Sequence, residues 1–155
     1  MKKATKPVIF IVIGIVFLIS ICIFNLKNHY TSHQGGASFD EKLNEVNTDN
    51  GSSFDFSNFK GNFTLMEFTT TKGSKIEISD TSIISKGTLD IVVSDSHYKD
   101  VIVHNSTKKS SFDFTAPKDG MYFIRLVGKN AYGTLDLKIN SDTNIDLIHK
   151  DIYDD

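Results

Sequence analysis

The sequence contains almost no cysteine or proline, and it has no tryptophan. Cys22 is the single cysteine, so neither an intrachain disulfide nor a cysteine-rich zinc site can form. Pro7 and Pro117 are the only prolines, which argues against a proline-rich stalk and favours a folded body. The lack of tryptophan weakens a sugar-binding interpretation, because large flat rings are the usual platform for sugars. The body must therefore be held together by packing alone.

Catalytic and cofactor motifs are also missing. The chain has no Gly-x-Ser-x-Gly, no His-Glu-x-x-His and no glycine-rich phosphate loop. His29 and His33 are four residues apart but have no obvious third ligand. His97 lies beside Asp95 and Asp100 in what is predicted to be a polar hairpin loop. We therefore expect no metal, no cofactor and no catalytic residue, and a hydrolase ranks last among the functions considered.

The N-terminal residues are typical of a membrane segment. Three lysines precede residues 7–24, which carry no charge, and Lys27 follows them. A helix of this length spans roughly 27 Å, close to the hydrocarbon core of a bilayer. The next residues are not small, which favours an anchor over a cleaved signal, and an isoleucine stands where lipidation of Cys22 would need a small residue. We expect residues 1–26 to lie in membrane lipid, with the N-terminus cytoplasmic and the C-terminal domain extracytoplasmic.

The remainder of the chain is acidic. Fourteen basic and nineteen acidic side chains follow the apolar segment, which gives a formal charge of −5. Such a body repels phosphates, and no basic stripe with interleaved aromatics is present. No nucleic acid partner is expected.

Residues 27–53 are polar and rich in turn-forming residues, which predicts a linker. One short helix is expected inside it. Ser38 followed by Glu41 matches a capping box, and Phe39, Leu43 and Val46 fall at helical spacing.

From Phe54 onwards the period changes to two. Leu89, Ile91 and Val93 alternate with Asp90, Val92 and Ser94, and the segment around Leu135, Leu137 and Ile139 alternates in the same way. Strands that are wetted on one face belong to antiparallel sheets. Turn signals divide this region into about seven or eight strands. They fall at residues 72–74, 86–87, 95–100, 105–110, 117–120 and 128–133.

These patterns predict an all-β fold for residues 54–140, an antiparallel, jelly-roll-like β-sandwich that follows the membrane helix. Residues 141–155 form an acidic tail. The tail either docks through Ile145, Leu147, Ile148 and Ile152 or frays.

Asp119, Gly120 and Tyr122 form an Asp-Gly-x-Tyr motif inside the stretch SFDFTAPKDGMYFIRLVGKNAYGTLDLKI. Together with KGSKIEI and GTLDIVVSD, this layout resembles pre-peptidase C-terminal domains and GOLD-type sandwiches of bacterial envelope proteins. The resemblance covers about half of the chain. It implies a structural motif, in which the glycine ends a tight turn and the tyrosine begins an inward-facing row. It also implies a non-catalytic appendage that contacts carbohydrate, protein or substrate.

Two aromatic residues are candidate contact residues. Tyr98 and Tyr132 fall in predicted turns, where an aromatic side chain is exposed more often than on a strand, with hairpin packing as the alternative. The sequence therefore favours a membrane-anchored module with a binding or scaffolding role at the cell envelope, whose partner is a protein or a cell-envelope glycan. The alternative is a secreted or lipidated accessory subunit of an envelope enzyme or transporter.

Overall fold

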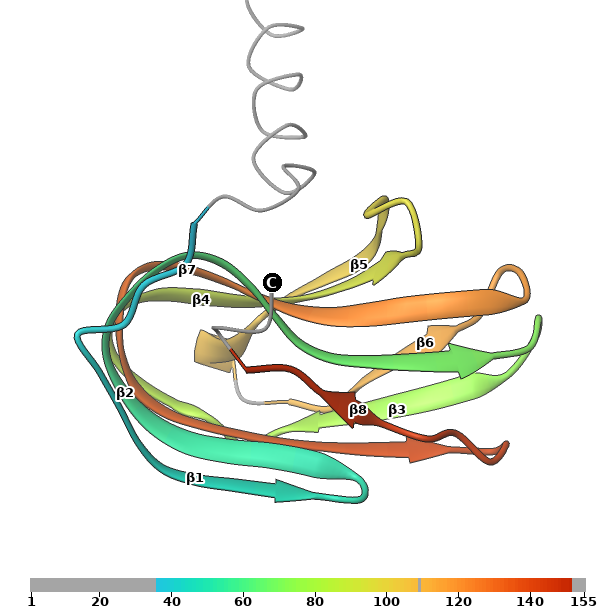
Figure 1. The fold of residues 1–155 in the computed structure, drawn as a ribbon, viewed down its shortest axis with the longest axis horizontal. Helices are drawn as coiled ribbons and strands as arrows, with labels where there is room; N and C mark the ends of the chain where they lie inside the picture. The colour runs from blue at the N-terminus through green and yellow to red at the C-terminus, as the bar shows by residue number, and fades with distance from the viewer. Residues whose placement is uncertain (1–35, 109, 152–155) are drawn as a thin grey trace, which may run out of the picture. The chain divides into compact units, whose positions relative to one another are not determined.

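The computed structural model describes residues 36–108 and 110–151, which form an antiparallel, sandwich-like β-domain (Figure 1). The described part holds eight strands and one short 3₁₀ turn, η1 (Ser106–Lys108). This confirms the predicted all-β class, the antiparallel pairing and the approximate strand number. The strands are β1 (Glu41–Thr48), β2 (Gly51–Thr70), β3 (Lys75–Asp80), β4 (Ile83–Asp95), β5 (Asp100–Asn105), β6 (Phe112–Thr115), β7 (Gly120–Ser141) and β8 (Ile148–His149).

Two long strands, β2 and β7, pair with each other along nearly their whole length. Both bend midway, and β4 bends with them, so the sheet folds over into two layers (Figure 1). The first layer contains β1, residues 51–59 of β2, residues 131–141 of β7, β3 and β6. The second layer contains β8, residues 61–70 of β2, residues 120–128 of β7, residues 89–95 of β4, and β5.

The bend uses glycine and asparagine residues in left-handed conformations. Gly61 in β2, Gly87 in β4 and Asn130 in β7 have φ of 94°, 76° and 48°. A Cβ on Gly87 would lie 2.2 Å from the carbonyl oxygen of Asn130, so this close approach needs glycine. The turns predicted at residues 86–87 and 128–133 are therefore wrong. Glycine and asparagine, which often form turns, form bulges and bends inside continuous strands at these positions.

The core lies between the two layers. Leu89, Ile91 and Val93 are fully buried on its second-layer side, as their alternation predicted. On the first-layer side, Leu135, Leu137 and Ile139 meet an aromatic cluster. The rings of this cluster are Phe39, Phe54, Phe56, Phe59 and Phe63.

The second layer departs from the predicted alternation. Val92, Ser94 and Arg125 point away from the core, yet they are only 0 %, 0 % and 2 % exposed. Strands buried on both faces are typical of covered sheets. The half-buried pattern predicted from the sequence therefore describes the first layer and not this one.

The expected short helix near Ser38 is a strand instead. Ser38 exchanges two backbone hydrogen bonds with Lys60, and β1 pairs with β2 from Glu41 onwards. Asn44 has φ of 55° at a bulge in β1, and this extra residue shifts the period of two. The bulge explains why Leu43 and the residues around it mimicked helical spacing. Because pairing with β2 satisfies the backbone, it overrides a helix that is too short to persist alone.

The C-terminal tail docks on β2 as far as Lys150. β8 pairs with β2 at Met66 and Glu67, and the amide of Lys150 donates to the carbonyl of Leu65 at 3.0 Å. Ile145 and Leu147 pack against the core as partly buried side chains. Ile152 lies outside the described residues.

The expected membrane anchor, residues 1–26, also lies outside the described residues. Within residues 36–108 and 110–151, no helix is long and apolar enough to cross a membrane.

Candidate functional site

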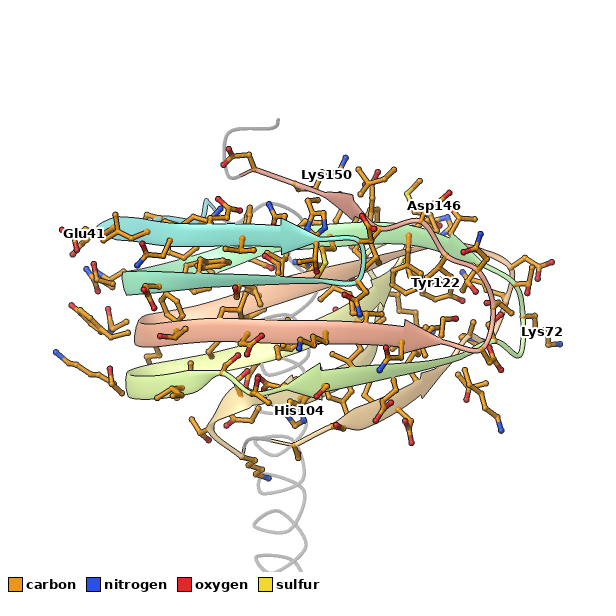
Figure 2. All side chains as sticks on the ribbon, turned by 90° about the horizontal axis from the view of Figure 1, so that it is seen from below. Glu41, Lys72, His104, Tyr122, Asp146 and Lys150 are labelled. Atoms are coloured by element: carbon orange, nitrogen blue, oxygen red, sulfur yellow. The ribbon has the colours of Figure 1, made fainter. Side chains whose placement is uncertain are left out.

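The Asp-Gly-x-Tyr motif ties two turns together at one end of the sheet. The Asp119 carboxylate accepts the backbone N–H of Lys72 at 2.7 Å, and Gly120 has φ of 137°. Tyr122 is fully buried, and its hydroxyl donates to the carbonyl of Lys118 at 2.7 Å. Figure 2 shows Lys72 and Tyr122 toward the same end of the domain. The predicted structural role of the motif is confirmed.

Tyr98 occupies the tip of the hairpin between β4 and β5. It has φ of 55°, and its ring stacks on Phe123 with centroids 4.8 Å apart. The guanidinium of Arg125 lies 5.4 Å from the same ring. The half-buried side chain therefore packs onto the second layer, as in the hairpin-packing alternative. A contact role for Tyr98 stays a prediction.

Tyr132 lies in β7 and not in a turn. It is half-buried opposite Lys86, whose ammonium lies 5.0 Å from the ring centroid. Lys86 is near the bend, whereas the hairpin that carries Tyr98 follows the other end of β4. The two tyrosines are thus far apart along β4 and do not form one site.

The hairpin itself is held in shape by Asp95. Its carboxylate accepts the backbone N–H groups of His97 at 2.9 Å and Lys99 at 3.1 Å, and it pairs with the ammonium of Lys118 at 2.9 Å. Burial raises the pKa of Asp95, but these hydrogen bonds outweigh burial and keep that pKa below its usual value. The tip of the hairpin is therefore pre-ordered.

A buried ion pair holds the first residue of β5. Arg125 Nη1 lies 3.6 Å from Asp100 Oδ1, too long for a hydrogen bond. Burial raises the pKa of Asp100 to about 6, and the charge of Arg125 lowers it only in part. Burial also lowers the pKa of Arg125, against the effect of Asp100 and Tyr98. Buried pairs of this kind are weak sources of net stability, but the loss of one partner leaves an uncompensated charge and is costly.

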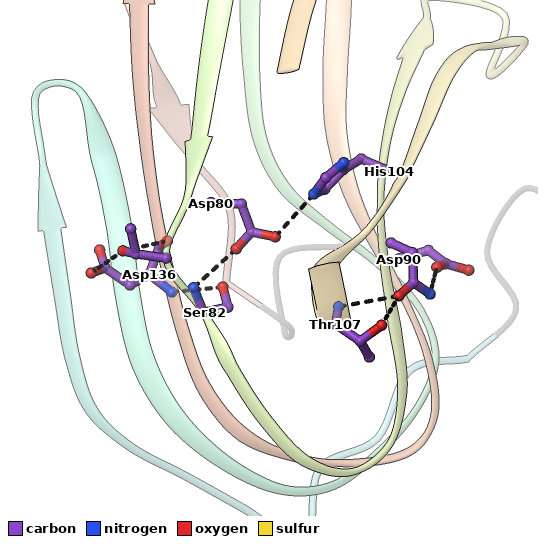
Figure 3. A network of polar contacts seen from close by, with 8 residues as sticks. Asp80, Ser82, Asp90, His104, Thr107 and Asp136 are labelled. Carbon is purple, nitrogen blue, oxygen red and sulfur yellow. Dashed lines mark hydrogen bonds and ion pairs between the residues drawn. The ribbon is translucent and has the colours of Figure 1, made fainter. Parts of the chain in front are cut away.

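A second polar network holds the other end of β5 (Figure 3). His104 Nε2 lies 3.4 Å from the fully buried Oδ2 of Asp80, without hydrogen-bond geometry. The imidazole stacks on Phe112 with centroids 4.4 Å apart. Asp80 Oδ1 in turn accepts the backbone N–H of Ser82 at 3.0 Å. His104 therefore fastens β5 of the second layer to β3 and β6 of the first.

A separate cluster of three polar residues, Asp90, Asn105 and Thr107, lies at the end of β5. Asn105 donates from its side-chain amide to Asp90 at 2.7 Å and accepts the backbone N–H of Thr107 at 3.1 Å (Figure 3). The Thr107 hydroxyl also donates to Asn105. These contacts end β5 and begin η1.

We call the open side of β5, residues 100–105, the β5 edge. Among the described strands β5 pairs only with β4, so its other side has no strand partner. Val101 and Val103 are 39 % and 43 % exposed there. An unpaired strand that carries exposed apolar side chains can accept another strand.

Neither His97 nor His104 is placed as the base of a Ser-His-Asp triad. Ser96 Oγ lies 3.4 Å from the ring of His97, but the carboxylate of Asp95 binds backbone and not that ring. His104 contacts a carboxylate, but in the described part its Nε2 has no hydrogen bond to a hydroxyl. Nucleophile, base and orienting acid are therefore not assembled on either histidine. The described residues also contain no group of three His, Cys, Asp or Glu that could hold a metal.

Two surface hollows lie away from these residues. One, of about 390 Å³, is lined by polar side chains of β3, β6 and the end of β7, including Glu77 and Asp113. The other, of about 280 Å³, lies between the tail and the ends of β2 and β7, next to Met121 and Ile148. Neither contains a histidine.

No family model matches the chain, and no curated protein matches it either. A solved structure titled "Glycosylation Associate Protein (Gap123) complex from Streptococcus agalactiae" is similar over 73 % of this chain, with 17 % sequence identity and a TM-score of 0.38. The match covers 41 % of that chain, so the present chain corresponds to less than half of its length.

Sequence reasoning gave no role to Asp80 and Arg125, and it placed Asp100 in a polar loop beside His97. Asp80 and Asp100 have polar neighbours at strand ends, where a charged residue is normally taken to face water. A charge between two aliphatic residues in FIRLV was the one available signal for Arg125.

Proposed function

We propose that the chain is a membrane-anchored, extracytoplasmic module of the cell envelope that acts by contact and not by catalysis. The anchor is the uncharged segment 7–24, and the domain is a jelly-roll-like sandwich of the pre-peptidase C-terminal or GOLD type. The observation that carries the proposal is the β5 edge. There an open strand with two exposed valines stands beside a pre-ordered hairpin.

The β5 edge and the neighbouring hairpin are held in place before a partner binds, which favours binding. A hairpin held by Asp95 and a strand fastened at both ends lose little conformational entropy when a partner binds. Val101 and Val103 supply apolar surface that a partner can bury. Main-chain hydrogen bonds along the open side of β5 would fix the orientation of a partner strand. The partner is a protein strand or, through the polar hollows, a cell-envelope glycan.

The membrane arrangement is tested first, in intact bacterial cells. A Cys22→Ser, Met121→Cys variant carries one thiol on an exposed residue of β7. We expect a membrane-impermeant maleimide to label it in intact cells, and the labelled protein to remain in the membrane fraction with its full mass. Labelling only after lysis, or loss of the N-terminal segment, would contradict the proposal.

The contact role is tested with a photo-crosslinking amino acid. Placed at Val103, it should give one discrete adduct in cells, whereas placed at Lys138, an exposed residue on the outer face of the first layer and outside both hollows, it should give none. Equal adduct patterns at the two positions would contradict a specific contact at the β5 edge. The mass of the adduct identifies the partner.

A further inference from the structure

The edges of the two layers differ in how well they resist pairing. β6 has four residues and β8 has two, which leaves little backbone to pair. β1 is long, but it carries a bulge at Asn44, and Lys42 turns inward with its ammonium 4.9 Å from the Phe54 ring. Bulges and inward-pointing charges are devices that keep an edge strand from pairing.

β5 has one such device, a bulge next to Asp100, and no inward-pointing lysine. Its sequence is Asp-Val-Ile-Val-His-Asn, with no charge between Asp100 and His104. Val101 is the extra residue at the bulge, and residues 102–105 pair regularly with β4. His104 points inward against Phe112, so it does not cover the outer face of the strand.

The sequence of β5 is also complementary to itself. When two copies run antiparallel with Ile102 opposite Ile102, Val101 of each copy lies opposite Val103 of the other. Cross-strand pairs of β-branched residues stabilise such a ladder. A two-fold axis through Ile102 uses the same surface on both copies, so the assembly closes as a dimer and does not grow into a fibre.

We propose that the β5 edge pairs with the β5 edge of a second copy of this chain, antiparallel and centred on Ile102, and so joins two second layers into one continuous sheet. The pairing satisfies the free backbone groups of both edges, and it brings the exposed Val101 and Val103 of the two copies together. It does not depend on the envelope location or on any other partner.

The register is tested by disulfide formation in the full chain, in detergent micelles and with Cys22→Ser as background. Val101→Cys and Val103→Cys variants are prepared separately, because the proposed register places each opposite the other and not opposite itself. Under mild oxidation the equimolar mixture should give mostly covalent dimer, and each variant alone should give little. A mixture of Leu43→Cys and Val46→Cys, on the equally open β1 and 55 % exposed, is the matched control for random collision.

Equal crosslinking in the two mixtures, or none in the first, would overturn the proposal. A second measurement does not need cysteine. Val103→Lys places a charge on an exposed position of the edge and should convert a dimeric parent to monomer in native mass measurements, whereas Val46→Lys should leave the dimer unchanged. A parent that is monomeric at all concentrations overturns self-pairing, and an adduct at Val103 with a different protein overturns it while leaving the proposed contact function intact.

Discussion

The outer faces of the two layers follow different rules, although the same long strands build both. In the first layer the outward residues of β7, such as Thr134 and Asp136, are polar and partly exposed. Asp136 accepts the Thr81 hydroxyl at 2.7 Å, a surface contact. In the second layer the outward residues of the same strand, Phe123, Arg125 and Val127, are buried. A strand thus changes from a half-wetted to a doubly buried pattern at its bend.

The two outer faces should therefore differ in how well they tolerate substitutions. Substitutions on the outer face of the first layer meet water, whereas those on the second layer meet packed side chains and one buried ion pair.

A charge introduced at Val92 should be the most damaging. Val92 is fully buried on the outer face of the second layer, so Val92→Asp should lower the free energy of unfolding by about 4 kcal/mol or more. Ser79→Asp, on the outer face of the first layer opposite Lys138, should change it by less than about 0.5 kcal/mol. Urea unfolding curves decide the matter, and equal losses would mean that the two faces do not differ.

Breaking the buried ion pair from one side should have the next largest effect. Arg125→Met leaves Asp100 without its cation and should cost about 3 kcal/mol. The double variant Arg125→Met, Asp100→Leu removes both charges and should recover most of that loss. No recovery in the double variant would show that Arg125 acts through contacts other than Asp100.

The titration of Asp100 should make the stability of the domain depend on pH. Its folded pKa of about 6 lies above the ordinary value of 3.8, so between these values the folded state binds more protons than the unfolded state. Stability should therefore fall as pH rises from about 4 to 6, by about 1–2 kcal/mol, because solvent reaches part of the Asp100 carboxylate and screens it. Asp95, whose pKa is lowered, works in the opposite sense and loses its contribution only below about pH 4.

Thermal unfolding measured between about pH 4 and 6 should show this fall in stability in the parent chain. The fall in stability should be absent from the Asp100→Asn variant, which has no titratable group at that position. An identical pH profile in both chains would mean that Asp100 titrates normally in the folded domain.

The smallest effect concerns the two histidines of this region. His104→Ala removes a ring that stacks on Phe112 and bridges the layers, and should cost about 1–2 kcal/mol. His97→Ala, in the exposed hairpin, should cost less than about 0.5 kcal/mol. Near-equal unfolding midpoints for the two variants would contradict the proposal that His104 holds β5 against the first layer.

Sequence reasoning recovered what depends on local pattern. The inward rows of Leu89, Ile91 and Val93, the antiparallel class and the structural role of Tyr122 were all predictable, because alternation and turn chemistry act over a few residues. The bends were not, since glycine and asparagine serve a turn and a bulge equally well.

The remaining errors have a common physical origin. β1 looked helical because a bulge at Asn44 altered its period, and only its pairing with β2 reveals a strand. Arg125 and Asp100 looked like surface charges because their burial depends on the β4–β5 hairpin packing against the outer face of the second layer. Long-range pairing decides both, and no local pattern records it.

The β5 edge is the proposed surface of contact, and amide hydrogen exchange of the full chain in micelles tests that proposal most directly. Exchange at residues 100–105 should slow as the concentration of the parent chain increases, while Val103→Lys should exchange rapidly at every concentration and both chains should protect the paired strands β2 and β7 equally. Exchange at β5 that is the same in both chains and independent of concentration would contradict the account.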